Sequence, residues 1–116
     1  MPDNIHFSAD PSHDLRSFLK EQPYSKVSVL VDEKSLRHCY PHIKNGLSEH
    51  NVINIPSGEQ QKNIETCTSI WRSLTELAFD RHALLIVLGG GVLGDMGGFC
   101  AATYKRGIDF MLIPTT

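Results

Sequence analysis

Apolar residues recur along this chain in two spacings, and each spacing predicts a different kind of element. Short runs rich in Val, Ile and Leu predict strands over 27–31, 52–55, 83–88 and 108–113. Between these runs, apolar positions three or four residues apart predict helices over 33–49, 63–77 and 92–105. Strands that alternate with helices in this way indicate an α/β fold with a mainly parallel sheet flanked by helices.

Two local features qualify this outline. Pro41 lies inside the first of these predicted helices, where its missing N–H predicts a break or a restart. Upstream, residues 5–8 are expected to form a short edge strand and 10–20 a helix capped by Asp10 or Ser12. No linker divides the chain, which indicates one domain. The chain stops directly after a strand-like run, so we expect it to be the N-terminal piece of a longer protein.

Polar or small residues follow each of the predicted strands directly. These positions are Asp32, the segment 57–62, the turn 89–95 and the pair Thr115–Thr116. The carboxyl ends of parallel strands meet at one edge of a sheet, and open α/β sheets bind their ligands there. We therefore expect these four segments to converge on a single rim.

A glycine turn follows the most apolar of the predicted strands. The run 84–88 leads into three glycines at 89–91, and a helix of small residues comes next. Glycine lets a ligand approach the backbone closely, and the start of a helix favours an anion, so the turn predicts a nucleotide phosphate site. The spacing GxGxxG over 89–94 is a weak signal by itself. The alternative is close packing of the helix on the sheet, which Gly97 and Gly98 also favour.

Two aspartates near this rim have both a binding and a structural interpretation. Asp32 follows a strand, where an acidic residue often holds an adenosine ribose, but it is also suited to cap the next helix. Asp95 is expected in the first turn of the helix after the glycines, where the helix dipole favours a carboxylate. Its binding interpretation is an acceptor for ribose hydroxyls or a carboxamide. Residue type alone leaves both pairs of alternatives open.

Two further segments carry charged candidates. Lys62 is suited to a phosphate or ribose and Glu59 to hydroxyl groups. The structural alternative is a capping box with Ser57 or a neighbour as the cap and Glu59 in the first turn. Arg106 is suited to a phosphate, but it also lies near a predicted helix end, with Gly107 as the residue that terminates it.

Composition narrows the classes of function. The 116 residues carry a net charge of −2, with 41% hydrophobic and 21% charged residues, which is typical of a globular domain. No basic cluster favours a nucleic acid partner, no apolar stretch spans a bilayer, and the N-terminus does not resemble a signal peptide. Three widely spaced cysteines suit reduced thiols, so we expect a cytoplasmic protein.

No catalytic or metal-binding motif is present. His38 and His42 have the i, i+4 spacing of metal ligands, but no third ligand is near and Pro41 disturbs the geometry, so a solvated helix face is favoured. The sequence lacks a GxSxG elbow, an HExxH motif and a lysine after the glycines. We assign no catalytic residue and no metal ligand within the chain.

Taken together and in order, four segments closely resemble the 3-dehydroquinate synthases. They are the segments 56–62, 89–99, 101–108 and 113–116. The resemblance runs from about Val27 to the end of the chain. Other sugar-phosphate cyclases are the nearest alternatives, and the iron-dependent alcohol and glycerol dehydrogenases are more distant ones. The pairs at 94–95 and 106–107 favour the dehydroquinate branch.

The resemblance implies a Rossmann-like NAD-binding domain over residues 1–116, followed in the family by a mostly helical metal-binding domain. It implies NAD contacts at Asp32, Ser57, Gly58, Glu59, Gln60, Gln61, Lys62, Gly90, Gly91, Val92, Leu93, Gly94, Asp95, Thr115 and Thr116. It also implies that Arg106 lies near the substrate phosphate and, in a homodimer, reaches the neighbouring subunit's site.

The reaction that the resemblance implies converts 3-deoxy-D-arabino-heptulosonate 7-phosphate to 3-dehydroquinate and phosphate, in the shikimate pathway. NAD transiently oxidises one alcohol and is regenerated, and a divalent metal, zinc or cobalt, polarises the reacting oxygens. The family's metal ligands lie beyond the last residue here, so we expect this chain alone to be inactive. A non-catalytic nucleotide-binding module is the alternative from a different class.

Overall fold

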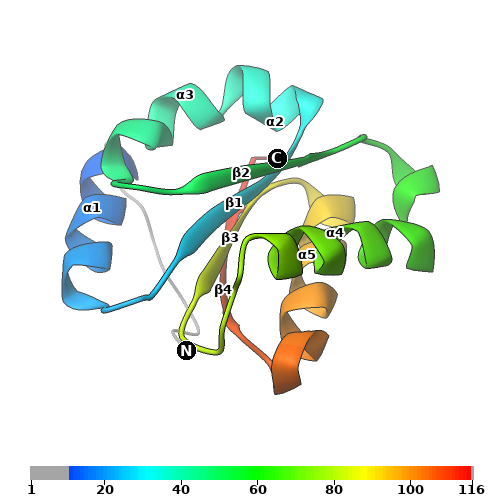
Figure 1. Cartoon of the computed structure of the whole chain (residues 1–116). Helices are drawn as coiled ribbons and strands as arrows, with labels where there is room; N and C mark the ends of the chain where they lie inside the picture. The colour runs from blue at the N-terminus through cyan, green and yellow to red at the C-terminus, as the bar shows by residue number, and fades with distance from the viewer. Residues whose placement is uncertain (1–10, 116) are drawn as a thin grey trace.

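The computed structural model describes residues 11–115, with side chains from Leu15 onward (Figure 1). The expected strand over 5–8, the alternative cap Asp10, and Thr116 lie outside the described residues. The other cap, Ser12, is wrong, because α1 begins at Pro11 and Ser12 therefore lies inside its first turn. The strands are β1 (Val27–Asp32), β2 (Asn51–Ile55), β3 (Leu84–Gly89) and β4 (Asp109–Pro114). The helices are α1 (Pro11–Glu21), α2 (Glu33–His38), α3 (Tyr40–Ile43), α4 (Ile64–Glu76) and α5 (Gly91–Thr103), with 3₁₀ turns η1 (Lys44–Gly46), η2 (Glu59–Gln61) and η3 (Tyr104–Arg106).

The four strands form one parallel sheet in the order β2-β1-β3-β4. This arrangement confirms the α/β fold with a mainly parallel sheet. The chain moves outward from β1 to β2 and then returns to place β3 on the other side of β1. The strand order therefore reverses between β1 and β3, and the crevice at their carboxyl ends is where an open α/β sheet binds its ligand.

Helices cover both faces of this sheet (Figure 1). Alternate residues of β3 divide between the faces, because successive side chains of a strand point in opposite directions. Leu85 and Val87 join the cluster beneath α4 and α5, whereas Leu84, Ile86 and Leu88 join the cluster beneath α1, α2 and α3. Burial on both faces explains why the strand is a continuous apolar run rather than an alternating one.

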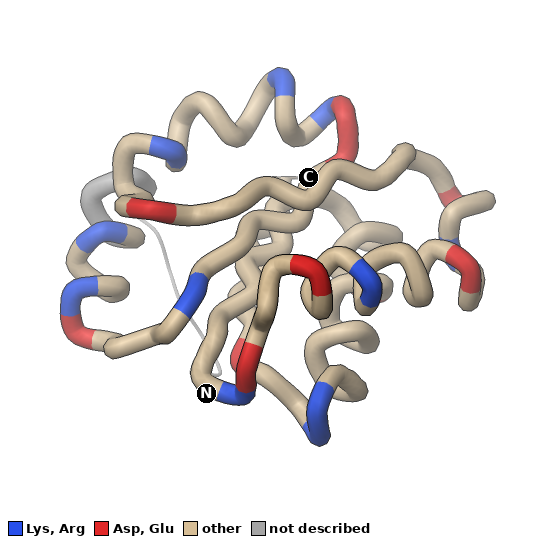
Figure 2. Tube along the Cα trace, in the orientation of Figure 1, with Lys and Arg blue, Asp and Glu red and all other residues tan. Residues whose placement is uncertain are grey.

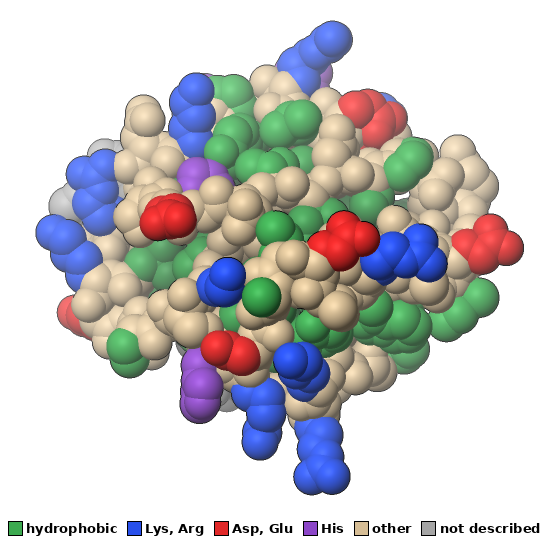
Figure 3. Space-filling view, viewed as in Figure 1, with side chains coloured by type: hydrophobic (Ala, Val, Ile, Leu, Met, Phe, Trp, Pro, Cys, Tyr) green, Lys and Arg blue, Asp and Glu red, His purple; other side chains and the backbone are tan. Residues whose placement is uncertain are grey.

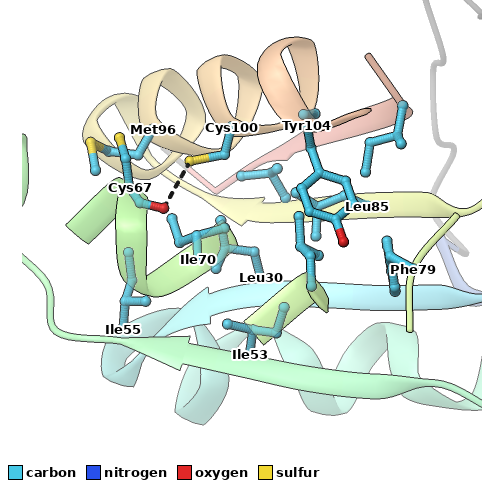
Figure 4. Close-up of a cluster of buried hydrophobic side chains, with 14 of the residues drawn as sticks. Leu30, Ile53, Ile55, Cys67, Ile70, Phe79, Leu85, Met96, Cys100 and Tyr104 are labelled. Atoms are coloured by element: carbon cyan, nitrogen blue, oxygen red, sulfur yellow. Dashed lines mark hydrogen bonds between the residues drawn. The ribbon is translucent and has the colours of Figure 1, made fainter. Parts of the chain in front are cut away.

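The cluster beneath α4 and α5 also holds two of the three cysteines (Figure 4). The Cys100 thiol donates to the Cys67 carbonyl oxygen at 3.8 Å and joins the two helices. Burial raises the pKa of the Cys100 thiol, with a smaller contribution from Cys67. All three cysteines are free, and the pKa shift keeps the Cys100 thiol protonated and unreactive.

The helical segments after β1 and β3 depart from their predicted boundaries. The segment predicted as one helix over 33–49 is broken at Cys39, and Pro41 lies in the first turn of α3, where its missing N–H costs nothing. Helix α5 begins one residue before the prediction and ends at Thr103. A 3₁₀ turn with Lys105 and Arg106 at positive φ follows it.

A buried hydroxyl in β1 gives the first testable prediction. Ser28 is fully buried, and its Oγ has no hydrogen-bond partner among the described residues. An unsatisfied buried polar group costs about 1–3 kcal/mol. We expect Ser28→Ala to raise the free energy of unfolding by up to about 1 kcal/mol, measured by urea denaturation.

The matched control is a second buried serine that does have partners. Ser35 is also buried, but its Oγ accepts from the Asp32 N–H at 3.1 Å. Ser35→Ala is expected to lower stability by about 1 kcal/mol. A loss of stability in Ser28→Ala equal to that in Ser35→Ala would contradict the interpretation of Ser28.

Candidate functional site

The predicted rim residues meet at a cavity of about 370 Å³ at the carboxyl ends of β1 and β3. One wall comes from β1 and α2, the second from the loop after β2, and the third from the glycine turn and the end of β4. The lining residues are Asp32, Lys34, Ser35, His38, Cys39, Ser57, Gly58, Gly90, Gly91, Val92, Leu93 and Thr115. Eight of the positions predicted from the sequence are therefore brought together here.

The glycines of the turn have different physical reasons to be glycine. A Cβ at Gly89 would lie 2.5 Å from Leu93 Cδ2, and one at Gly97 would lie 2.5 Å from Val87 Cγ2. Close packing therefore accounts for Gly89 and Gly97. A Cβ at Gly91 would meet no atom of the chain within 4 Å, although this residue lines the cavity. Packing does not require glycine at this position, whereas the approach of a ligand would.

The turn also presents backbone donors to the cavity. Gly90 is the N-cap of α5 and has no side-chain cap, and the first hydrogen bond within the helix runs from the Gly94 N–H to the Gly90 oxygen at 2.9 Å. The N–H groups of Gly91 and Val92 precede that bond, at the positive end of the helix dipole. The arrangement suits an anionic group such as a pyrophosphate.

Asp32 caps helix α2, which is the structural role considered for it, and it also lines the cavity. Its Oδ1 accepts from the Lys34 N–H at 3.0 Å and the Ser35 N–H at 2.8 Å, which caps α2. The two interpretations of Asp32 are therefore compatible, because one carboxylate oxygen makes both capping bonds and the other is left over.

Ser57 forms a bridge that the sequence did not indicate. Its N–H donates to Glu33 Oε2 at 3.0 Å and its hydroxyl to Glu33 Oε1 at 2.6 Å. The capping box considered for this segment is wrong, because Gly58 precedes Glu59 at the start of η2 without a side-chain cap, and Asn63 caps α4 by accepting from the Thr66 N–H. The bridge instead ties the loop after β2 to the start of α2, and Ser57 is the partner that lines the cavity.

The bridge predicts a pH-dependent contact. The hydrogen bond from Ser57 lowers the pKa of Glu33 below its ordinary value of 4.5. Because the folded-state pKa is the lower one, the bridge is complete above pH 4.5 and is lost as pH falls through the lowered value. We expect the Ser57 amide to titrate at that lowered pKa in NMR spectra and to lose hydrogen-exchange protection in Glu33→Ala.

Glu65→Ala supplies the control, because this exposed glutamate lies in the first turn of α4, away from the loop. Unchanged exchange at Ser57 in Glu33→Ala would show that the bridge does not hold the loop.

Lys62 and Asp95 lie beside the cavity rather than in its wall. Their side chains form an ion pair with an Nζ–Oδ2 distance of 3.1 Å, which joins the segment before α4 to α5. The hydrogen bond and charge of Asp95 raise the pKa of Lys62. Asp95 is in the second turn of α5, not the first as predicted, because the helix begins at Gly91. Both residues line an adjacent cavity of about 350 Å³.

The other predicted positions lie near these two cavities. Glu59, Gln60 and Gln61 form the turn η2 between the loop at Ser57 and α4. Gly94 faces β4, where an added Cβ would lie 3.3 Å from Leu112 Cδ1. None of these four lines the larger cavity.

Arg106 lies near the amino ends of the strands, just before β4 begins, and so at the end of the sheet opposite to the cavity. Helix α5 separates it from the glycine turn by 13 residues, which is about 20 Å of helix. Lys105 and Arg106 adopt φ values of 46° and 68°, and Gly107 follows with φ 106°. Holding a non-glycine residue in this region costs about 1–3 kcal/mol, so the backbone at Lys105 and Arg106 keeps this conformation at an energetic cost. Arg106 does not contribute to the cavity of its own chain.

Four lining residues were missed by the sequence prediction. Lys34, Ser35, His38 and Cys39 all belong to α2 or its C-cap. The signal that identifies them is their spacing of four residues, which places Lys34 beside His38 and Ser35 beside Cys39 on one side of a helix. His38 and His42 lie in different helices, and no group of three or more potential metal ligands occurs within residues 11–115.

Charge is dispersed over the described surface. Figure 2 shows acidic and basic positions on most elements, and the face in Figure 3 carries both signs intermixed. No helix in the described part of the chain is long and apolar enough to cross a membrane.

Comparison of the sequence with known proteins gives consistent results. Residues 52–116 match the family model of the 3-dehydroquinate synthase N-terminal domain. The chain is 54% identical over 103 residues to the 3-dehydroquinate synthase of Syntrophotalea carbinolica, which covers 84% of this chain and 28% of that protein. It is 55% identical over 96 residues to the synthase of a Sulfurovum species, which covers 79% of this chain and 27% of that protein.

Solved structures share the fold at lower identity. A 2-deoxy-scyllo-inosose synthase complexed with carbaglucose-6-phosphate, NAD⁺ and Co²⁺ has a TM-score of 0.75 at 24% identity, over 90% of this chain and 30% of that one. An iron-containing alcohol dehydrogenase from Corynebacterium glutamicum has a TM-score of 0.75 at 17% identity, over 98% of this chain and 33% of that one. These likenesses show the Rossmann-like fold alone.

The sequence matches are more specific than the shared fold. The chain spans less than a third of the length of the curated relatives it matches. Within that span, the family model covers the loop at Ser57, the glycine turn and β4, which build two of the three walls of the cavity. The chain belongs to the 3-dehydroquinate synthase family.

Proposed function

We propose that this chain forms the NAD-binding wall of a 3-dehydroquinate synthase. The observation that carries the proposal is the open position at Gly91. It lies in the wall of a cavity at the strand-order reversal, where packing gives no reason for glycine. A cavity bounded by a helix start and by Asp32, at the end of the adjacent strand, fits the pyrophosphate and adenosine ribose of a dinucleotide.

The residues present suit separate parts of NAD. The N–H groups of Gly91 and Val92 would bind the pyrophosphate, and the remaining oxygen of Asp32 would accept from the adenosine ribose. Lys62 and Asp95 would extend the site toward the nicotinamide end. NAD, when bound, supplies reversible oxidation of one substrate alcohol. The chain's own contribution is to bind and orient the cofactor, and the Lys62–Asp95 ion pair fixes the direction of both side chains.

The rest of the active site would come from elsewhere. The described residues do not fit a divalent metal, because no cluster of three potential ligands occurs among them. We assign the metal ligands, and the zinc or cobalt that they would hold, to a C-terminal domain. Arg106, at the far end of the sheet, would bind the substrate phosphate of the partner subunit in a homodimer. Three free cysteines support a reducing cytoplasmic location.

Two measurements test this proposal. NAD should bind to the purified protein and perturb amide resonances of the glycine turn. A protein that joins this chain to a metal-binding domain of the family should release phosphate from 3-deoxy-D-arabino-heptulosonate 7-phosphate, whereas this chain alone should not. A synthase regenerates NAD, so no NADH should accumulate during turnover. Stoichiometric NADH would indicate a dehydrogenase, and turnover by this chain alone would contradict the division of the site.

A further inference from the structure

The backbone pairing of β1 with β2 ends at the rim of the cavity. The last paired residues are Asp32 and Ile55. Beyond this pair, β1 continues into α2 at Glu33, whereas β2 continues into the loop 56–58. The first residue of that loop is Pro56, which has no N–H to donate. The position of the loop relative to α2 therefore depends on a contact other than the strand ladder.

The carboxylate of Glu33 supplies this contact. The Ser57 N–H donates to Oε2 at 3.0 Å and the Ser57 hydroxyl donates to Oε1 at 2.6 Å. Hydrogen bonds to an ionised acceptor are stronger than those between neutral groups. Because one of the two donors belongs to the backbone, the bridge restrains the loop itself and not only the side chain of Ser57.

The two partners of the bridge lie differently relative to the cavity. Among the described residues, Ser57 and Gly58 line it and Glu33 does not. Both oxygens of Glu33 are used on Ser57. Glu33 can therefore act on a ligand in the cavity only through the position of the loop.

A wall that is in place before binding changes the affinity for a ligand. Ordering a loose loop at the moment of binding subtracts from the binding free energy. The apparent dissociation constant rises in inverse proportion to the fraction of molecules in which the loop already has its bound position. A residue that increases this fraction raises the affinity without a contact to the ligand.

We propose that Glu33 is a positioning residue for the dinucleotide. Through its two hydrogen bonds to Ser57 it holds the loop after β2 as a preformed wall of the cleft, at the adenosine end. The inference rests on the proposed function, since it takes the cavity to be the dinucleotide cleft.

Titration of the purified protein with NAD and with AMP tests this role. Glu33→Ala removes the bridge. If the loop then has its bound position about one-fifth of the time, the affinity for NAD falls about fivefold. AMP carries only the adenosine half and should lose the same factor. The unfolding temperature should change little, because Glu33 is exposed.

Glu33→Gln is the matched control. The amide oxygen of glutamine can accept from the Ser57 N–H, and its NH₂ group can donate to the Ser57 hydroxyl. The alanine and glutamine variants remove the same charge from the same place and differ only in the bridge. We expect Glu33→Gln to bind NAD and AMP within about twofold of the unaltered protein.

The other outcomes separate this inference from the proposed function. Unchanged NAD and AMP affinity in Glu33→Ala would overturn the role of Glu33 and leave the proposed function intact. Equal losses in the alanine and glutamine variants would also overturn it, because the charge and not the bridge would then be responsible. If neither NAD nor AMP binds the unaltered protein, the proposed function fails, and the role of Glu33 fails with it.

Discussion

Replacing Gly91 with leucine is expected to abolish NAD binding and to leave the unfolding temperature unchanged. A Cβ at this position would meet no atom within 4 Å outside its own turn of helix, so the start of a side chain has open space here. The same side chain would extend into the cavity at the start of α5, where the pyrophosphate is proposed to lie. We expect NAD affinity to fall by at least 100-fold, the equivalent of about 2.7 kcal/mol, in calorimetric titration.

The variant Gly91→Ala tests whether the loss of NAD affinity depends on the size of the side chain at this position. It adds one methyl group and should weaken NAD by less than the leucine variant, with the same unfolding temperature. Normal NAD affinity in Gly91→Leu would show that the cofactor does not approach the backbone at this turn. A large fall in unfolding temperature would show instead that Gly91 has a packing role.

Replacing Gly97 with leucine is expected to have the opposite pattern, with a large loss of stability. A Cβ here would lie 2.5 Å from Val87 Cγ2 and 3.1 Å from Leu30 Cδ2, both on the sheet beneath α5. Overpacking costs about 1–3 kcal/mol or more, out of a total stability of about 5–15 kcal/mol. The gain of up to about 1 kcal/mol from removing a helical glycine is too small to offset it. Trp71, the single tryptophan, reports the change by fluorescence during denaturation, because its Nε1 donates to Cys100 and Thr103 of α5.

Gly98→Ala is the matched control for this prediction. A Cβ at Gly98 would lie 3.4 Å from the Phe110 ring, which is ordinary contact. This variant should gain up to about 1 kcal/mol, because alanine loses less conformational entropy in a helix. Gly97→Ala places the same Cβ against Val87 and should lose stability instead. A gain of stability in Gly97→Ala equal to that in Gly98→Ala would contradict the close approach of α5 to the sheet at Gly97.

The fold was predictable because its signals are local. Strands β1 and β3 are apolar runs that end in Asp32 or glycine, and α4 has apolar residues at helical spacing, so each element is specified by its own residues. The exception was the segment after β1. Its spacing suggested one helix, and the structure divides it at Cys39 because Pro41 cannot continue a helix but can begin one.

The candidate site was predictable only in part. The residues that follow each strand could be placed on one rim, because parallel strands end at the same edge. The Glu33–Ser57 bridge could not be predicted, since it joins residues 24 apart through side chains. The lining residues Lys34 and His38 were missed because the direction of α2 relative to the sheet decides which of its sides faces the cavity.

The pairing of β1 with β3 has a consequence for folding. The two main walls of the cavity belong to segments that are distant in sequence and become neighbours only when these parallel strands pair. A dinucleotide would therefore bind the native state and not the unfolded chain. At a free concentration 100 times its dissociation constant it would add about 2.7 kcal/mol to the stability. Cellular cofactor supply would then help to set the fraction of this protein that stays folded.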